Sequence, residues 1–291
     1  MGYQVDNAVI MAAGLSSRFA PLSYERPKAL ITVKGEVLIE RQIRQLREAG
    51  IREIILVAGY KKEQFYYLRE KYGVIVIENP EYLTRNNNSS IYTARKYLKN
   101  SYICSADNYF AENPFEKQVE DSYYAAVYAE GATEEWCMTS DREGYITGVQ
   151  VGGKDAWYML GHVFWSEKFS RRFLEILERE YDRAETRDKL WESIFIEHLR
   201  ELPMKIRKYP ENEIYEFDSL DELRQFDTSY ISDTRSEILK EIAGKLSGTE
   251  AEIQDIRAYK AGNAAAGFTF DFRGKKYRYS YEDEKLGEER A

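Results

Sequence analysis

The sequence predicts an α/β fold built on a mainly parallel sheet, with an inserted antiparallel region and a small C-terminal α+β appendage. Three observations predict this architecture. Apolar strand-like runs alternate with helix-like runs over residues 8–105, the order typical of parallel sheets covered by helices on both faces. Strand-like runs then follow one another over residues 123–165 without a long helix between them. After about Tyr230 a helix and two strands indicate a second domain, so we expect domains at residues 1–230 and 231–291.

The alternating part begins with residues 8–11 (AVIM), a short apolar run that ends at Ala12-Ala13-Gly14. This pattern is typical of a buried strand that leaves its sheet into a glycine-containing loop. Residues 36–49 carry apolar side chains at helical spacing, and Gly50 supplies the C-terminal stop. The alternation continues through strand 51–58, helix 61–72, strand 74–77, helix 90–98 and strand 102–105.

The middle of the chain is predicted to place antiparallel strands over the ligand-binding end of the sheet. These strands are expected at residues 123–129, 136–139, 145–151 and 157–165. Helices at 168–183 and 189–202 and a strand at 205–209 follow. The run IYEFD at residues 214–218 then brings two carboxylates back toward the core.

The appendage is predicted to contain a helix at 233–246 and two strands, 267–272 and 276–281. The turn Arg273-Gly274-Lys275 joins the two strands. An edge strand such as 268–272 can pair with another subunit, so we expect a packing or oligomerisation module and a homo-oligomer formed through it.

Charge and composition exclude several classes of function. The net charge of −8 over 291 residues opposes a nucleic-acid footprint, which needs a basic face. No apolar run of about 20 residues and no basic leader are present, so we expect neither a membrane span nor export. Cys104 and Cys137 lack metal-ligand spacing and indicate a reducing, cytoplasmic location without zinc. His162 and His198 lie in no motif and are interpreted as core or surface histidines.

The loop after the first strand is a candidate anion site. Its backbone N–H groups can converge at the carboxyl end of the sheet, and Arg18 adds positive charge there. Pro27 places a rigid turn before Lys28, which can reach the same anion. A glycine loop of this kind is by itself weak evidence, because strand-to-helix turns often contain glycine.

The whole string AAGLSSRFAPLSYERPKAL, residues 12–30, is far more specific. It resembles the N-terminal signature of the sugar-nucleotidyltransferase-like family, which has a Rossmann-like sheet and reads AAG-x-G-x-R, a P-L pair and then P-K-x-L. One position departs from the pattern. Ser16 stands where the family commonly has its second glycine, so the loop loses a residue that adopts positive φ freely, although the hydroxyl can donate to a phosphate.

Over roughly the first 225 residues the chain resembles one branch, the bacterial CTP:phosphocholine cytidylyltransferases. The departure is Ser105, where relatives often carry an extra aspartate next to the pair Ala106-Asp107. The supporting residues are Gly59-Tyr60, Glu78-Asn79-Pro80 with Tyr82, Asn86-Asn87 with Ser90, Asp107-Asn108-Tyr109, Thr133 to Trp136, Asp188 with Trp191-Glu192, and Tyr215 to Ser219.

The resemblance implies transfer of CMP from CTP to phosphocholine, giving CDP-choline and pyrophosphate with Mg²⁺ as cofactor. The attacking phosphate is already ionised near pH 7, so charge neutralisation and alignment are required instead of a general base. Arg18 and Lys28 are the candidate catalytic residues that hold the leaving pyrophosphate. The candidate metal ligands are Asp107 at a strand end and Glu216 and Asp218, which alternate by two on a strand.

Cytosine recognition is expected from the backbone of Ala12, Ala13 and Gly14 and from the polar residues Asn86, Asn87 and Ser90. A second interpretation of the asparagine run is a helix cap, because Asn and Ser favour that position. Both roles are compatible with one site.

The acceptor site needs aromatic faces and few carboxylates, because a quaternary ammonium cannot donate a hydrogen bond. The available set is Trp136, Asp188, Trp191 and Glu192. In isolation a tryptophan is more often a core residue than part of a cage. Alternative acceptors are phosphoethanolamine, 2-aminoethylphosphonate and a sugar 1-phosphate, and a rival of another class is a catalytically silent nucleotide-binding regulator.

The tail at residues 252–281 weakly resembles the opening strands of choline-kinase-like phosphotransferases. It lacks a catalytic loop and a metal-binding lobe, so the resemblance does not imply kinase activity.

Overall fold

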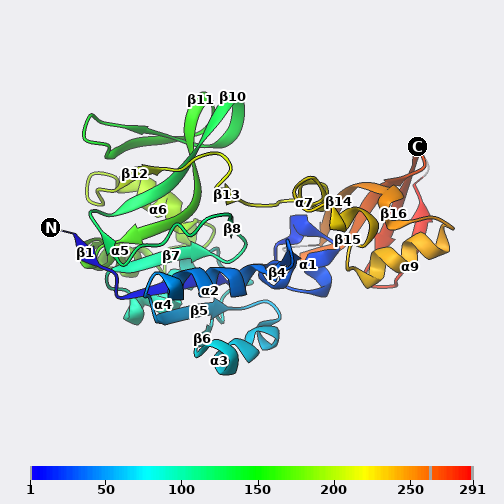
Figure 1. Ribbon diagram of the computed structural model, residues 1–291, viewed down its shortest axis with the longest axis horizontal. Helices are drawn as coiled ribbons and strands as arrows, with labels where there is room; N and C mark the ends of the chain where they lie inside the picture. Colours follow the sequence, from blue (N-terminus) through cyan, green and yellow to red (C-terminus); the bar gives the residue numbers. More distant parts are fainter. Residues whose placement is uncertain (1, 262–263, 290–291) are drawn as a thin grey trace. The chain divides into compact units, whose positions relative to one another are not determined.

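The computed structural model describes residues 2–261 and 264–289 (Figure 1). The chain divides into two compact units. The first unit contains residues 1–14 and 38–216, and the second contains residues 15–37 and 217–291. The predicted domain boundary at residue 230 stays a prediction. Residues 262–263 and 290–291 of the predicted appendage lie outside the described residues. No helix in the described ranges is long and apolar enough to cross a membrane.

A seven-stranded sheet in the order β12-β10-β11-β7-β2-β5-β6 forms the centre of the first unit. Its parallel part confirms the predicted alternation: β7, β2, β5 and β6 pair in parallel, and β2 lies between β7 and β5. The antiparallel part joins this sheet through β11, which pairs with β7. The strands are β2 (Asn7–Ala12), β5 (Glu53–Ala58), β6 (Ile75–Glu78), β7 (Ser101–Ser105), β10 (Tyr123–Ser140), β11 (Ile146–Trp165) and β12 (Lys205–Lys208).

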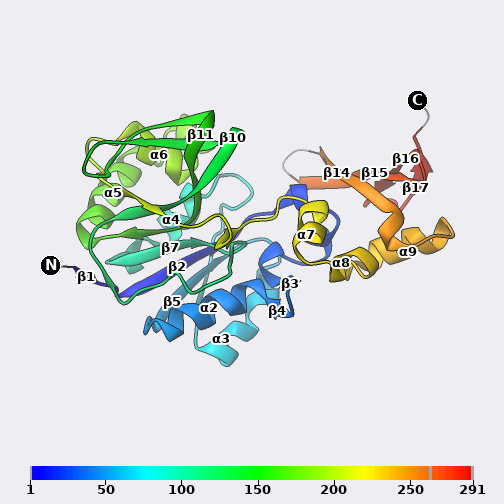
Figure 2. The ribbon, with the colours of Figure 1, turned by 45° about the horizontal axis from the view of Figure 1, so that its top comes forward.

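Helices cover both faces of this sheet, as predicted, and Figure 2 shows α2 and α5 on opposite sides of it. Val9 and Ile55 belong to one buried cluster with the apolar side chains of α4, α5 and α6. Their neighbours Ile10 and Leu56 are equally buried and point to the opposite face, because side chains alternate along a strand. The helical segments are α2 (Leu38–Glu48), η3 (Lys62–Phe65), α3 (Tyr67–Tyr72), α4 (Asn88–Ala94), η4 (Arg95–Tyr97), α5 (Glu167–Glu180), η5 (Ala184–Thr186) and α6 (Trp191–Glu197).

The antiparallel region differs from the prediction. The four short strands expected there are two long ones, β10 and β11, which pair along most of their length. The polar residues between the expected strands interrupt the hydrophobic pattern, but pairing needs only backbone groups, and it continues with register shifts. Gly131 and Gly152 take positive φ within these irregular stretches.

Two small sheets complete the first unit. β1 (Tyr3–Gln4) pairs with β9 (Gln118–Val119), and β8 (Tyr109–Phe110) pairs with β13 (Ile214–Tyr215). The second pairing is important for the site, because it brings the chain from residue 214 back beside the turn that follows β7.

The second unit combines the signature segment with the C-terminal part of the chain. The predicted helix at 36–49 begins only at Leu38, because Glu36–Val37 (β4) pairs with Thr32–Val33 (β3). Two helices after residue 219 were not predicted. Beside β3 and β4, the elements are η1 (Ser17–Phe19), α1 (Leu22–Glu25), η2 (Lys28–Leu30), α7 (Leu220–Phe226), α8 (Ser229–Ser232), α9 (Glu237–Lys245), η6 (Glu250–Glu252), β14 (Ile253–Ala261), β15 (Ala264–Phe272), β16 (Lys275–Ser280) and β17 (Leu286–Glu288).

The four-stranded sheet of this unit has the order β14-β15-β16-β17. The two predicted strands are present as β15 and β16, joined by a turn in which Arg273 and Gly274 take positive φ. The prediction that residues 268–272 form an edge strand is wrong, because β14 pairs with the other side of β15. Among the described strands, the edges are β14 and β17.

Candidate active site

The turn after β7 carries Asp107, a half-buried residue at the carboxyl end of the strand. The Ala106 N–H donates to the Met11 carbonyl of β2 at 3.1 Å, so the turn continues the parallel pairing. From the buried face of α2, the Gln42 side chain donates to the Ser105 and Asn108 carbonyls at 2.8 and 3.4 Å. The helix therefore fixes the turn that carries Asp107.

Glu216 reaches the same turn through the pairing of β13 with β8. Tyr215 pairs with Tyr109 in this antiparallel ladder. The residue after Tyr215, Glu216, therefore lies beside the residue before Tyr109, Asn108. The Asn108 side chain donates to Glu216 Oε2 at 3.2 Å. Carboxylate oxygens are the ligands that Mg²⁺ prefers, and two carboxylates are borne here by adjoining segments, the half-buried Asp107 and the exposed Glu216. The third predicted ligand, Asp218, belongs to the second unit.

The loop after β2 is held by close backbone contact with the chain after β5. The Tyr60 N–H donates to the Ala13 carbonyl at 3.1 Å. A Cβ on Gly59 would lie 2.8 Å from that carbonyl oxygen and 2.8 Å from Tyr82, so only glycine fits there without displacing the loop. Ala12 is half-buried, Ala13 is buried, and Gly14 is exposed. Sequence reasoning gave Gly59 no role of its own, although its contacts hold the predicted nucleotide loop.

The asparagine run at the start of α4 is joined to residues 186–192. Asn86 donates from its side chain to the Asp188 carbonyl at 3.1 Å. Asn87 makes no side-chain cap to α4; its Oδ1 accepts from the Trp191 N–H at 2.7 Å and its Nδ2 donates to Glu192 Oε2 at 3.1 Å. The capping interpretation is therefore wrong for Asn87, which connects two of the predicted acceptor residues.

Ser90 is buried, 3% exposed, and its hydroxyl accepts from Asn79 Nδ2 at 3.2 Å. Asn86 is exposed and Asn87 is half-buried. Within the predicted base-recognition set, the two asparagines are thus nearer the surface than Ser90.

Trp191 lies in the hydrophobic core, 1% exposed, with its ring edge-on to Trp165 at 5.1 Å. The Trp191 ring also stacks on Tyr124 of β10, at a centroid distance of 5.8 Å. The Tyr124 hydroxyl lies 3.5 Å from Glu192 Oε1. The structure therefore gathers Tyr124, Trp191, Glu192 and Asn87, and Tyr124 is a member of this group that sequence reasoning missed.

The electrostatics of this group are unusual. Burial raises the pKa of Glu192 to about 7, and the hydrogen bonds from Asn87 and Tyr124 oppose that rise. Burial, and then the charges of Glu192 and Glu216, raise the pKa of Tyr124 well above its ordinary value. The charges of two carboxylates thus act on one buried tyrosine.

The remaining acceptor candidates are less buried. Trp136 is half-buried on β10 and packs against the core cluster, and Asp188 is exposed. The Asp188 carbonyl accepts from the side chain of Asn86, the neighbour of Asn87.

Arg18, Lys28 and Asp218 lie in the second unit. Arg18 Nη1 and Asp218 Oδ2 form an ion pair at 2.7 Å between two solvent-accessible side chains. Lys28 is 4% exposed, and its ammonium lies 5.6 Å from the centre of the Phe19 ring. Ser16 adopts the left-handed conformation, φ 45°, at the position where the resembling family has glycine, so the loop keeps that geometry without the glycine.

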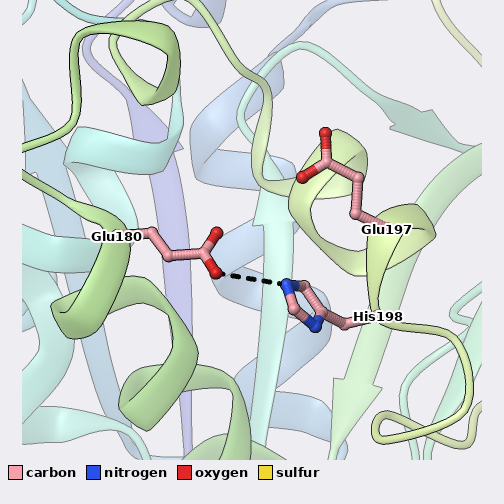
Figure 3. A group of neighbouring side chains, drawn as sticks. All are labelled: Glu180, Glu197 and His198. Atoms are coloured by element: carbon pink, nitrogen blue, oxygen red, sulfur yellow. Dashed lines mark ion pairs between the residues drawn. The ribbon is translucent and has the colours of Figure 1, made fainter.

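The histidines have structural roles, in agreement with their interpretation from sequence. His162 is buried, and burial followed by the charge of Arg207 lowers its pKa to about 3. His198 lies with Glu180 and Glu197 in a group of metal-ligand type (Figure 3). Cations already neutralise this group, since Arg179 lies 3.2 Å from Glu180 and Lys189 lies 2.6 Å from Glu197. We interpret it as an ion-pair network around α5 and the end of α6.

A parallel sheet with a glycine loop after one strand and a carboxylate turn after its neighbour is typical of Rossmann-like nucleotidyltransferases, and this chain is an enzyme of that class. A model of the MobA-like NTP transferase domain matches residues 8–186, and the chain belongs to that family.

Three relatives are informative. The choline-phosphate cytidylyltransferase of Streptococcus pneumoniae is 36% identical over 220 residues, which are 76% of this chain and 96% of the relative. The solved structure of CTP:phosphocholine cytidylyltransferase from Streptococcus pneumoniae superposes with a TM-score of 0.74, covering 78% of this chain and 99% of that one. The 2-aminoethylphosphonate cytidylyltransferase of Lancefieldella rimae is 38% identical over 234 residues, or 79% of this chain and 95% of the relative.

Proposed function

We propose that this enzyme transfers CMP from CTP to phosphocholine and releases pyrophosphate. The observation that carries the proposal is the half-buried Glu192 carboxylate, which lies beside the Tyr124 hydroxyl and the Asn87 side chain. A negative charge next to an aromatic ring favours a quaternary ammonium, which offers no hydrogen-bond donor. The similarity to the Streptococcus pneumoniae cytidylyltransferase supports the same acceptor.

The reaction joins a phosphate oxygen of the acceptor to the α-phosphorus of CTP, while the bond from that phosphorus to the pyrophosphate oxygen breaks. The attacking oxygen is already ionised near neutral pH, so no residue needs to remove a proton. The protein contributes alignment of the two phosphates and positive charge for the leaving group. We assign the leaving pyrophosphate to Arg18 and Lys28, and the cytosine to the loop at residues 12–14 with Asn86, Asn87 and Ser90.

Asp107 and Glu216 are the residues that would hold Mg²⁺, with Asp218 as a third ligand. A bound Mg²⁺ ion supplies charge neutralisation on the phosphate oxygens. Asn108 keeps the Glu216 carboxylate beside the Asp107 turn, and Gln42 keeps the turn itself in place. The chain thus presents oxygen ligands on a supported segment rather than on a free loop.

A second acceptor, 2-aminoethylphosphonate, is favoured by one observation, the 38% identity to the Lancefieldella rimae enzyme. Its primary ammonium can donate hydrogen bonds, so it would use carboxylate and amide acceptors more than aromatic faces. Pyrophosphate release with CTP and each of phosphocholine, phosphoethanolamine, 2-aminoethylphosphonate and glucose 1-phosphate decides between them. We expect the highest kcat/KM with phosphocholine. Absence of turnover with every acceptor would favour the silent regulator instead.

The replacement Trp136→Leu tests the aromatic part of the acceptor site. A cation–π face contributes roughly 1–2 kcal/mol when desolvated, so KM for phosphocholine is expected to rise roughly 5- to 30-fold, with KM for CTP nearly unchanged. Trp157→Leu on β11 is the matched control, since Trp157 is also half-buried and packs against the core cluster. Equal effects of the two replacements would remove Trp136 from the acceptor site. Trp191 is unsuitable for this test, because its removal leaves a cavity in the core.

The raised pKa of Glu192 predicts a pH dependence. The carboxyl is neutral below pH 7 and charged above it, so kcat/KM for phosphocholine should rise as the pH passes about 7. In Glu192→Gln this component should disappear, leaving only the ionisation of the acceptor phosphate, which also titrates near pH 6. Glu197→Gln, on the exposed side of the same helix, should keep the wild-type profile. An unchanged profile in Glu192→Gln would contradict the assignment.

The same shift has a consequence for stability. A carboxyl whose pKa is higher in the folded protein stabilises the fold when protonated and loses this contribution as the pH rises through about 7. Glu192→Gln should therefore be more stable than wild type at pH 8, by an amount on the order of 3 kcal/mol, and nearly equal to it at pH 4.

Two further expectations belong to the proposal. The free, buried Cys104 and Cys137 are compatible with the cytoplasmic location predicted from cysteine usage. A homo-oligomer through the appendage stays a prediction, with β14 and β17 in place of residues 268–272 as the described strands open to pairing.

A further inference from the structure

The second unit joins the signature segment, residues 15–37, to residues 217–291, which we call the C-terminal part. Within the second unit, η1 of the segment lies against β14 and β15 of the C-terminal sheet. The C-terminal part is therefore in direct contact with the segment that carries Arg18 and Lys28.

The segment is held on the C-terminal side of Lys28 by two donors that share one acceptor. The Thr32 carbonyl accepts from the Tyr230 hydroxyl at 2.7 Å and from Arg235 Nη1 at 2.7 Å. The Arg235 guanidinium also lies 4.1 Å above the Tyr230 ring and donates to Ser229. These contacts fix the backbone four residues after Lys28.

A second attachment lies on the N-terminal side of Lys28. Glu25 Oε1 accepts from the Ile238 N–H at 2.8 Å and from the Ser236 hydroxyl at 3.1 Å, at the start of α9. The Tyr24 ring stacks on Tyr281 with centroids 3.7 Å apart and planes within 5°. These contacts fix the backbone three residues before Lys28.

The backbone of Arg235 is itself unusual. It takes φ 61°, a left-handed conformation that residues with a Cβ adopt at a cost. Strained residues of this kind persist where the surrounding contacts determine them, and here the side chain reaches the Thr32 carbonyl.

We infer that the C-terminal part is a positioning element of the enzyme, in which Arg235 and Ser236 hold the segment around Lys28. The inference rests on the proposed function, because it assigns these residues to the CTP side of the reaction. Lys28 lies in η2, which has only three residues, so its position depends on the attachments on both sides. Arg235 acts through Thr32 and does not itself bind substrate.

The test compares Arg235→Ala with Arg273→Ala in the full-length protein. Arg273 is the matched control, because its guanidinium pairs with Glu252 and Ser247 inside the C-terminal part. We expect Arg235→Ala to lower kcat/KM for CTP roughly 10-fold, with KM for phosphocholine within about twofold of wild type. Arg273→Ala should change neither, and Arg235→Lys should recover part of the loss, because its ammonium can still donate to Thr32.

A double-variant cycle separates positioning from stability. If Arg235 acts through Lys28, its replacement should have little further effect in a Lys28→Ala background. An undiminished loss in that background, or equal losses in Arg235→Ala and Arg273→Ala, would overturn the inference. The dissociation constant of CTP, measured by calorimetry, decides the matter independently of the acceptor. If phosphocholine proves inert, the proposed function fails, whereas weaker CTP binding by Arg235→Ala alone would still support the positioning role.

Discussion

Replacing Lys28 by alanine is expected to lower kcat/KM at least about 100-fold, the range observed when a transition-state charge stabiliser is lost. The physical reason is burial: the Lys28 side chain is 4% exposed and lies against the Phe19 ring. An ammonium in such surroundings acts on a developing pyrophosphate charge through a lower effective dielectric than a surface lysine does. The measurement is steady-state pyrophosphate release with CTP as the varied substrate.

Lys34→Ala is the matched control for this prediction. Lys34 lies in the same segment but is exposed, and its ammonium lies over the Phe226 ring. We expect Lys34→Ala to keep most of the activity. Lys28→Arg should recover little of the lost activity, because a planar guanidinium does not replace a compact ammonium in a buried site. Turnover of Lys28→Ala close to wild type would exclude this lysine from the mechanism.

The parallel part of the fold could be predicted because its signals are local. The run 8–11 and the runs at 51–58 and 102–105 became β2, β5 and β7 in adjacent positions. Each has the apolar composition of a strand buried on both faces, and each is followed by a turn or helix signal. The nucleotide loop and the Asp107 turn follow from this order, since the carboxyl ends of parallel strands meet at one edge.

The attachment of the signature segment to the C-terminal part could not be predicted. Glu25 and Ser236 are separated by 211 positions in the sequence, and Thr32 and Arg235 by 203. No local pattern reports such a pairing, because each partner alone is typical of an ordinary exposed polar residue. The grouping of residues 15–37 with 217–291 rests on long-range contacts of this kind.

Two buried glutamines of α2 could have been recognised from the sequence pattern. Gln42 and Gln45 are buried on the same face of α2 as Ile39 and Leu46, so they are polar residues on an apolar stripe. Such residues need partners, and these donate to backbone carbonyls at residues 105–112. For Trp191, the resemblance predicted a ring that faces the acceptor. The structure places this ring in the core, and the aromatic residue beside Glu192 is Tyr124.

The Asp107→Asn replacement is expected to abolish turnover at low Mg²⁺, with a loss on the order of 10³-fold, because a neutral amide binds this cation more weakly than a carboxylate. The fold should be retained, since asparagine has nearly the same size and the turn is held by Gln42 and Ala106 through backbone groups. Asp218→Asn should also raise the Mg²⁺ requirement.

Asp121→Asn is the matched control for the metal prediction, because Asp121 is also half-buried in the first unit but pairs with Lys205 and Tyr145. Pyrophosphate release is measured against Mg²⁺ concentration for all three variants, and EDTA should abolish the wild-type activity. Since the amide lowers affinity for the ion, raising Mg²⁺ should restore part of the activity of Asp218→Asn, whereas loss of fold would not respond to the metal. Full activity of Asp107→Asn and Asp218→Asn at limiting Mg²⁺ would show that these carboxylates do not hold the ion, and the metal assignment would then pass to the phosphates of CTP alone.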